Sequence, residues 1–213
     1  MALTRLQKYS AVAVSNLRHN LMPHLLLSVG FLLLTPVIFG VNDLDARAAA
    51  VPLEYFVSLT GAVLLTPIFL PEQDEAVRDV VMARETGLTP IYLLRAATAV
   101  LALLCISLSA VLMLWAGDCQ VDLTFLSAVF ANGIFLGGLG AFACSLCGNI
   151  AVGYMIPVLY YVLNFAGKPQ QFGPFYLFSL SQGQTEGKWL LLFSGCMLLA
   201  AAIGLRHMRQ KLQ

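Results

Sequence analysis

Charge is scarce in this sequence. Asp, Glu, Lys and Arg make up 11% of the 213 residues, whereas soluble globular chains carry roughly 25%. Hydrophobic residues make up 59%, and the mean hydropathy is +0.82. This composition excludes an ordinary soluble protein and predicts an integral membrane protein in contact with a lipid bilayer. The formal net charge is +1 and no basic run occurs, so no nucleic-acid partner is expected.

Motifs that would support an enzyme are also missing. The three histidines, His19, His24 and His207, show no H-E-x-x-H spacing, and no G-x-S-x-G occurs. No predicted span contains a pair of carboxylates. A P-loop is absent, because residues 183–189 are one residue short between the glycines and lack the Ser or Thr after Lys. We therefore expect no catalytic residue, no ATP hydrolysis by this chain and no cofactor bound to it.

Cysteine use indicates neither a disulfide framework nor a metal site. Four of the five cysteines lie in or at the ends of predicted spans, and Cys119 lies in a predicted outer loop. Cys144 and Cys147 form a C-x-x-C pair, but no second ligand pair accompanies it. We expect these thiols to pack as small hydrophobic side chains, and we predict no metal site.

Six apolar stretches predict an all-α membrane protein. A helix needs about 20 residues to cross the hydrocarbon core, and the stretches lie at about 22–41, 53–70, 91–116, 123–143, 150–166 and 189–205. They predict six spans in a single transmembrane domain over residues 1–213. Residues 2–20 carry apolar side chains at steps of three and four among basic ones, which predicts a helix on the cytoplasmic membrane surface. A frayed polar leader is the alternative for this segment.

Small and polar residues mark the later spans. Gly133 and Gly137 form a small-xxx-small spacing in span four, which predicts close packing against another helix. Polar groups at bilayer depth need partners or a cavity. We therefore predict a substrate pathway lined by Asn132, Tyr154, Tyr161 and Asn164. An interfacial aromatic belt is the alternative explanation of the tyrosines.

Ionisable groups inside the spans are nearly absent. Glu54 and Arg95 lie at predicted span boundaries, and Lys188 lies in the last outer connection. A proton- or ion-coupled carrier normally needs ionisable groups within its spans. The sequence therefore weakens the hypothesis of such a carrier.

The outer connection over residues 167–187 is unusually apolar for a solvated loop. Its aromatic side chains favour the membrane interface over water. We predict a partly inserted outer element between spans five and six, with an outer gate formed by Phe172, Phe175, Tyr176 and Phe178.

The distribution of Lys and Arg predicts that both termini are cytoplasmic. With the N-terminus inside, the inner segments hold nine of these residues: Arg5, Lys8, Arg18, Arg78, Arg84, Arg95, Arg206, Arg209 and Lys211. The outer segments hold three, which are Arg47, Lys168 and Lys188. This asymmetry follows the positive-inside rule, and it places residues 71–95 in the cytoplasm.

Residues 71–95 carry eight of the 23 formal charges, counted as 12 basic plus 11 acidic residues. Pro71 suits the first position of a helix, and the acidic residues at 72, 74 and 75 lie in the first turn, where the helix dipole favours them. Gly87 predicts the end of this helix, and Thr89 with Pro90 predicts the N-cap and first residue of the next. The pattern predicts a charged cytoplasmic helix between spans two and three. A solvated loop whose charges keep it out of lipid is the alternative.

These features together resemble the ABC-2 type permease subunits of ATP-binding cassette transporters. In that family the link between spans two and three commonly has an acidic start, a helical stretch, a turn with Gly or Pro, and a basic residue that enters span three. In this sequence those places are held by Glu72 and Glu75, by residues 77–84, by residues 87–90 and by Arg95. The surface helix before span one and the outer element before span six fit the same topology.

The resemblance implies a coupling helix that docks on a separate ATPase subunit, which binds ATP and Mg. It assigns the coupling contacts to Glu72, Gln73, Asp74, Glu75, Val77, Arg78, Val81, Arg84 and Arg95. It also implies a second permease copy, identical or different, in a bacterial plasma membrane, and export of a small peptide, an antibiotic or a lipid-like substrate. The residues leave two alternatives open, which are a stand-alone membrane protein of immunity or resistance and a carrier that works without an ATPase.

Overall fold

The computed structural model describes residues 16–73 and 88–212, which form helices and turns and contain no strand. Five helical stretches in these two ranges are long and apolar enough to cross a membrane: Met22–Phe39, Ala46–Pro71, Thr89–Ala116, Leu123–Cys147 and Lys188–Arg209. The sequence predicted six spans. The remaining apolar helix, Ile150–Ala166, is shorter, with 17 residues.

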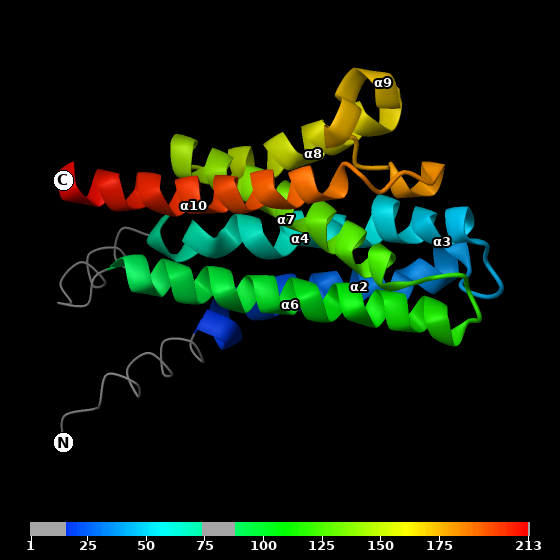
Figure 1. Cartoon of the computed structure of the whole chain (residues 1–213). Coiled ribbons are helices and arrows are strands. Elements are labelled where there is room, and N and C mark those ends of the chain that lie inside the picture. The colour runs from blue at the N-terminus through cyan, green and yellow to red at the C-terminus, as the bar shows by residue number, and fades with distance from the viewer. Residues whose placement is uncertain (1–15, 74–87, 213) are drawn as a thin grey trace.

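Figure 1 shows the helices running back and forth along one bundle. The π-helix η1 (Leu17–Leu21) leads into α2 (Met22–Phe39). A second long helix is built from α3 (Ala46–Pro52), the π-helical turn η2 (Leu53–Val57), α4 (Leu59–Leu65) and the 3-10 helix η3 (Thr66–Gln73). Next come α6 (Leu88–Ala116), α7 (Leu123–Cys147) and α8 (Ile150–Ala166). The short helices α9 (Pro169–Phe172), η4 (Gly173–Phe175) and η5 (Leu180–Gln182) then precede α10 (Lys188–Leu212).

The second long helix begins seven residues earlier than predicted, at residue 46 instead of 53. Asp45 caps this start, since its side chain accepts a hydrogen bond from the Ala48 N–H at 3.0 Å. Pro52 lies within the helix and has no N–H to donate. The following turn widens, and the Ser58 N–H bonds at 3.0 Å to the carbonyl five residues back. The helix therefore continues past the proline.

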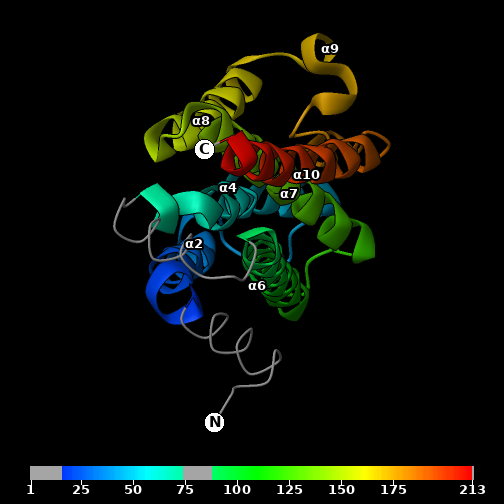
Figure 2. The ribbon, with the colours of Figure 1, turned by 90° about the vertical axis from the view of Figure 1, so that its left-hand side faces the viewer.

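Helix α7 packs against α4, α6, α8 and α10, and Figure 2 shows it among them along the bundle axis. Glycines allow these close approaches. A Cβ atom added at Gly61 of α4 would lie 2.0 Å from the Gly133 carbonyl oxygen, and one at Gly137 would lie 2.5 Å from the Gly61 carbonyl oxygen. A Cβ at Gly138 would lie 2.5 Å from the Gly195 carbonyl oxygen of α10. The close packing predicted from the Gly133 and Gly137 spacing is thereby confirmed.

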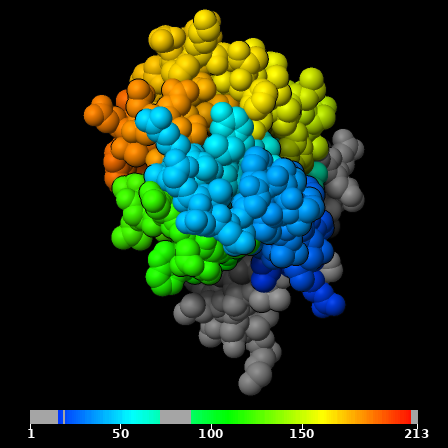
Figure 3. All heavy atoms as spheres, turned by 90° about the vertical axis from the view of Figure 1, so that its right-hand side faces the viewer, coloured from blue at the N-terminus to red at the C-terminus, as the bar shows by residue number. Residues whose placement is uncertain are grey.

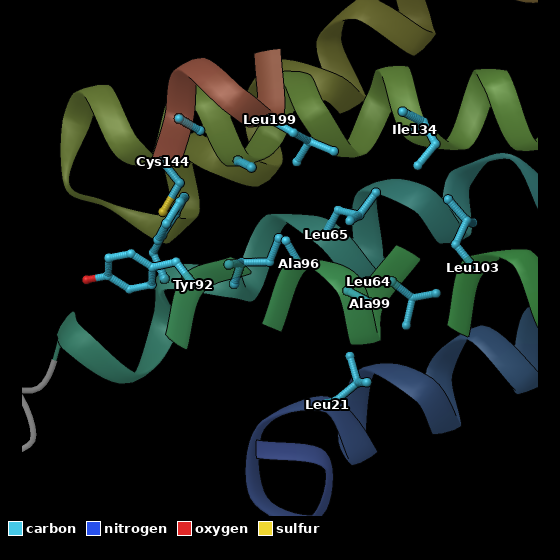
Figure 4. Close-up of a cluster of buried hydrophobic side chains, with 14 residues drawn as sticks. Leu21, Leu64, Leu65, Tyr92, Ala96, Ala99, Leu103, Ile134, Cys144 and Leu199 are labelled. Atoms are coloured by element: carbon cyan, nitrogen blue, oxygen red, sulfur yellow. The ribbon is translucent and has the colours of Figure 1, made fainter. Parts of the chain in front are cut away.

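The core between these helices is filled by aliphatic side chains and small residues. Figure 4 shows Leu65 of α4, Leu103 of α6, Ile134 of α7 and Leu199 of α10 in one buried cluster. The outward faces are also apolar, as Leu33 of α2 with 66% exposure illustrates. Such faces are typical of helices in lipid.

The two ends of the bundle differ in charge. Where α2 and α6 begin and α10 ends, the described side chains include the cations Arg18, Arg95, Arg206 and Arg209. All acidic side chains that the structure describes belong to the other half, where α2 joins α3, α6 joins α7 and the 167–187 connection lies: Asp43, Asp45, Glu54, Asp118, Asp122 and Glu186. Figure 3 shows this second end of the bundle. We call the two ends the basic end and the acidic end.

Candidate functional site: a buried ion pair at the acidic end

A carboxylate lies inside the bundle near its acidic end. Glu54 is the second residue of η2, and its side chain is fully buried. The early helix start at Asp45 places Glu54 about two turns into the second helix. A buried charge strongly destabilises a fold unless a counter-charge and hydrogen bonds compensate it. The partners of Glu54 therefore determine whether this end of the bundle is stable.

The counter-charge is Lys188, the first residue of α10. Its Nζ lies 2.6 Å from Oε1 of Glu54, and the two side chains are 5% and 0% exposed. The same ammonium group donates to Oδ1 of Asn132 on α7 at 3.1 Å and to the Leu177 carbonyl at 2.5 Å. All three N–H bonds of the ammonium group thus have an oxygen acceptor. The pair joins α10 to the second helix, and Asn132 adds α7.

The carboxylate also binds the backbone of the outer segment, by which we mean residues 167–187. Oε1 of Glu54 accepts the Leu180 N–H at 2.9 Å, and Oε2 accepts the Ser181 N–H at 2.9 Å. Charge-assisted bonds of this kind are stronger than bonds between neutral groups. The ion pair therefore holds this outer segment as well as the helices.

Two buried asparagines complete the network. Asn132 donates from Nδ2 to the Leu177 carbonyl at 2.9 Å. Asn164 of α8 accepts the Leu177 N–H at 3.1 Å on Oδ1 and donates to the Tyr160 carbonyl at 3.1 Å. Both asparagine side chains are fully buried. Side chains from the second helix, α7, α8 and α10 thus hold the backbone of residues 177–181.

Aromatic rings pack around this backbone. Phe178 is fully buried and stacks on Tyr55, with ring centroids 4.1 Å apart. Tyr161 packs edge-on to Phe178 at 5.3 Å, and its hydroxyl donates to the Tyr55 carbonyl at 2.6 Å. Tyr176 is buried beside them, and its burial, followed by the nearby Tyr55 and Glu54, raises the pKa of its phenol. The shell keeps water away from the ion pair.

The residues predicted as an outer gate differ in position. Tyr176 and Phe178 are buried in the aromatic shell. Phe172 is half-buried and packs edge-on to Tyr160 at 6.1 Å. Phe175 is 39% exposed. Two of the four predicted residues therefore lie beside the ion pair, and two lie further out along the outer segment.

The residues predicted as a substrate pathway divide in a similar way. Asn132, Asn164 and Tyr161 meet around residues 177 and 178, where their polar groups bind backbone or Lys188. Tyr154 lies elsewhere on α8, with its hydroxyl 3.5 Å from the Val63 carbonyl. The structure brings together three of the four, as parts of a hydrogen-bonded network.

Sequence reasoning missed the burial of three charged residues. Glu54 was assigned to a span boundary and Lys188 to an outer connection, yet both are buried and paired. Arg95 was also assigned to a span boundary, and it is 8% exposed and donates from Nη1 to the Ile68 carbonyl at 3.3 Å. Each residue was interpreted from its neighbours in the sequence, whereas its partner belongs to a part of the chain that is distant in sequence.

At the basic end, α10 is tied to α7 and α6. Arg206 and Arg209 donate to the Cys144 and Leu146 carbonyls of α7, at 3.4 and 2.8 Å. These carbonyls lie in the last turn of α7, where the helix dipole favours cations. The Thr89 hydroxyl of α6 lies 2.8 Å from Nδ1 of His207. Thr89 was predicted as an N-cap, whereas α6 already begins at residue 88 and the hydroxyl faces α10.

The predicted coupling helix lies largely outside the described residues. Asp74, Glu75, Val77, Arg78, Val81 and Arg84 all fall between the two described ranges. Glu72 and Gln73 are the last residues of η3. Pro71 was predicted to start a new helix, but it lies within η3, which continues the second long helix. Of the predicted coupling residues, Arg95 is the one whose contacts the structure shows.

Comparison with protein-family models, curated proteins and solved structures finds no match to this chain. Among the described residues, no three His, Cys, Asp or Glu side chains gather as a metal site would require. Function is therefore inferred from the residues and their contacts.

Proposed function

We propose that this chain is the permease subunit of an ATP-binding cassette exporter, moved by separate ATPase subunits that bind ATP and Mg. In this proposal α8 is the fifth of six spans, both termini are cytoplasmic and the membrane is a bacterial plasma membrane. The cargo is a small peptide, an antibiotic or a lipid-like molecule, and a second permease copy completes the pathway.

The observation that carries the proposal is the path from the charged 71–95 link to the buried ion pair. η3 and α6, which flank this link, meet at the basic end, where Arg95 of α6 binds the Ile68 carbonyl of η3. Thr89 binds His207, so a displacement of the link reaches α10 as well as α6. The basic end is the cytoplasmic end by the positive-inside rule.

Helix α10 then carries the displacement across the bundle. From His207 to Lys188 the helix spans about 28 Å, taking a rise of about 1.5 Å per residue. Its far end is the residue that pairs with Glu54. A push applied at the cytoplasmic end therefore acts on the buried network at the outer end, as alternation between two access states requires.

Reconstitution with an ATPase tests this function. The chain is co-purified with a candidate cassette ATPase from the same cell to measure association, and the two are reconstituted in sealed liposomes to measure ATP-driven cargo movement. A variant with Asp74, Arg78 and Arg84 all replaced by Ala is expected to lose both. The matched control replaces one acidic and two basic residues at the acidic end, Glu186, Arg47 and Lys168, and is expected to retain both. Full association and transport by the first variant would refute the coupling assignment.

An ATPase-independent carrier is a second candidate, and the buried ion pair is the observation that favours it. The sequence had weakened this hypothesis because it showed no ionisable group within the spans beyond boundary residues such as Glu54 and Arg95. The same triple variant distinguishes the two functions. Gradient-driven uptake into liposomes that contain this chain alone, unchanged by the triple substitution, would favour the carrier.

A further inference from the structure

We propose that residues 173–183, here called the outer strap, form a hinged gate that the Glu54–Lys188 pair holds shut. The middle of the strap is packed inside the bundle, since Tyr176, Leu177, Phe178 and Leu180 are all at most 6% exposed. Its two ends are glycines at the surface. The strap therefore combines a buried centre with ends that are suited to rotation.

Both end glycines have left-handed backbone angles. Gly173 has φ of 52° and Gly183 has φ of 80°, and no atom lies within 4 Å of a Cβ built at either position. Glycine adopts such angles without the steric penalty that side chains introduce. Both ends of the strap therefore have backbone angles that favour glycine, and the space where a side chain would lie is open.

A cavity of about 500 Å³ provides space beside the strap. It is lined by both end glycines, by Ser179 of the strap and by residues 184–187. The Ser179 hydroxyl is buried and has no hydrogen-bond partner within the described residues. An unpaired buried hydroxyl gains a partner when water reaches it, so outward movement of the strap recovers part of the free energy of opening.

The ion pair holds the strap by both of its charges. The carboxylate of Glu54 binds the N–H groups of Leu180 and Ser181, and the ammonium of Lys188 binds the carbonyl of Leu177. When α10 withdraws Lys188, the carboxylate loses its counter-charge and the Leu177 carbonyl loses a donor at the same moment. A buried carboxylate without its partner is strongly unfavourable, so the strap and its pocket become accessible to water. We call the hold of the Glu54–Lys188 pair on the strap the latch. The latch does not depend on the proposed transport function, whereas passage of cargo through the opening rests on it.

Cysteine labelling of the chain alone tests the latch. All five native cysteines are replaced by Ser, Ser179→Cys is added as the reporter, and the protein is placed in nanodiscs. A charged, membrane-impermeant maleimide is expected to label this reporter slowly in the parent. In Glu54→Gln and in Lys188→Met it should label at least about tenfold faster, because each change removes one side of a buried ion pair.

Two controls make the result specific. Ser145→Ala removes a buried 2.9 Å bond to the Ala202 carbonyl at the basic end and should leave the reporter rate unchanged. Gln184→Cys places an exposed reporter on the same cavity, and it should react at the same rate in the parent and in both latch variants. Unchanged labelling of Ser179→Cys in both latch variants would overturn the proposal.

The unaltered protein gives an independent measurement if a latch variant does not fold. Hydrogen exchange in nanodiscs should show that the amides of Leu177, Leu180 and Ser181 exchange faster than those of the α7 core, because the strap opens without global unfolding. Equal protection would overturn the proposal. Neither experiment includes an ATPase, so loss of the latch and loss of ATPase coupling are separable results.

Discussion

Replacement of Gly61 by Ala should separate α4 from α7 and destabilise the bundle. The added Cβ would lie 2.0 Å from the Gly133 carbonyl oxygen and 2.3 Å from its Cα, both backbone atoms that cannot rotate away. Ordinary contact begins at 3.4 Å, so the two helices must move apart by about 1.4 Å at this crossing, the difference between 3.4 and 2.0 Å. Forced overpacking of a core costs about 3 kcal/mol, and the better helix propensity of Ala returns about 1 kcal/mol. The expected net loss is about 2 kcal/mol.

The measurement is reversible unfolding in mixed detergent micelles, followed by circular dichroism. Gly30→Ala is the matched control, because Gly30 lies in α2 with no atom within 4 Å of a Cβ at that position. This control should unfold at the same detergent fraction as the parent or a higher one, since it gains helix propensity alone. If Gly61→Ala were as stable as Gly30→Ala, the close crossing of α4 and α7 would be refuted.

Two further predictions concern the buried network. In the same unfolding assay, Glu54→Gln and Lys188→Met should each lower the free energy of unfolding by about 3 kcal/mol. The double variant should lose at least about 2 kcal/mol less than the sum of the two single losses, because the second change removes the charge that the first leaves unpaired. Losses that simply add would contradict the pairing. Tyr161→Phe should cost about 1 kcal/mol, since its hydroxyl donates to a backbone carbonyl at 2.6 Å. Tyr154→Phe should change the free energy of unfolding by less than about 0.5 kcal/mol, because the hydrogen bond of its hydroxyl is long at 3.5 Å. Equal losses in the two tyrosine variants would show that the two hydroxyls are not held as described.

Much of the helical architecture follows from hydropathy. The predicted span at 150–166 coincides with α8, and those at 22–41 and 123–143 begin where α2 and α7 begin. The second helix was placed too late, although Asp45 offered an N-cap signal before the alanines and Pro52 does not end the helix. A proline ends a helix unless the following turn can rearrange its hydrogen bonds, and the π-helical turn after Pro52 does so.

The buried network was less accessible to sequence reasoning. Glu54 and Lys188 are separated by 134 residues, and each one alone resembles an interfacial charge at the end of an apolar run. One signal was present, since Glu54 is flanked by Leu53, Tyr55 and Phe56 in the interior of a helix once the Asp45 cap is recognised. Pairing between distant charges needs the helix packing, which the glycines of α7 set by backbone contacts.

The separation of 134 positions between Glu54 and Lys188 also sets an order of events at the ribosome. At about 5–20 residues per second, the carboxylate emerges about 7 to 27 s before its counter-charge. During that interval the second helix cannot rest in lipid at its final depth, because an unpaired carboxylate in the bilayer is costly. The nascent chain must be sheltered by the insertion machinery until α10 arrives. Assembly of this protein in the membrane is therefore completed by its last helix, and a chain truncated before residue 188 lacks the group that completes it.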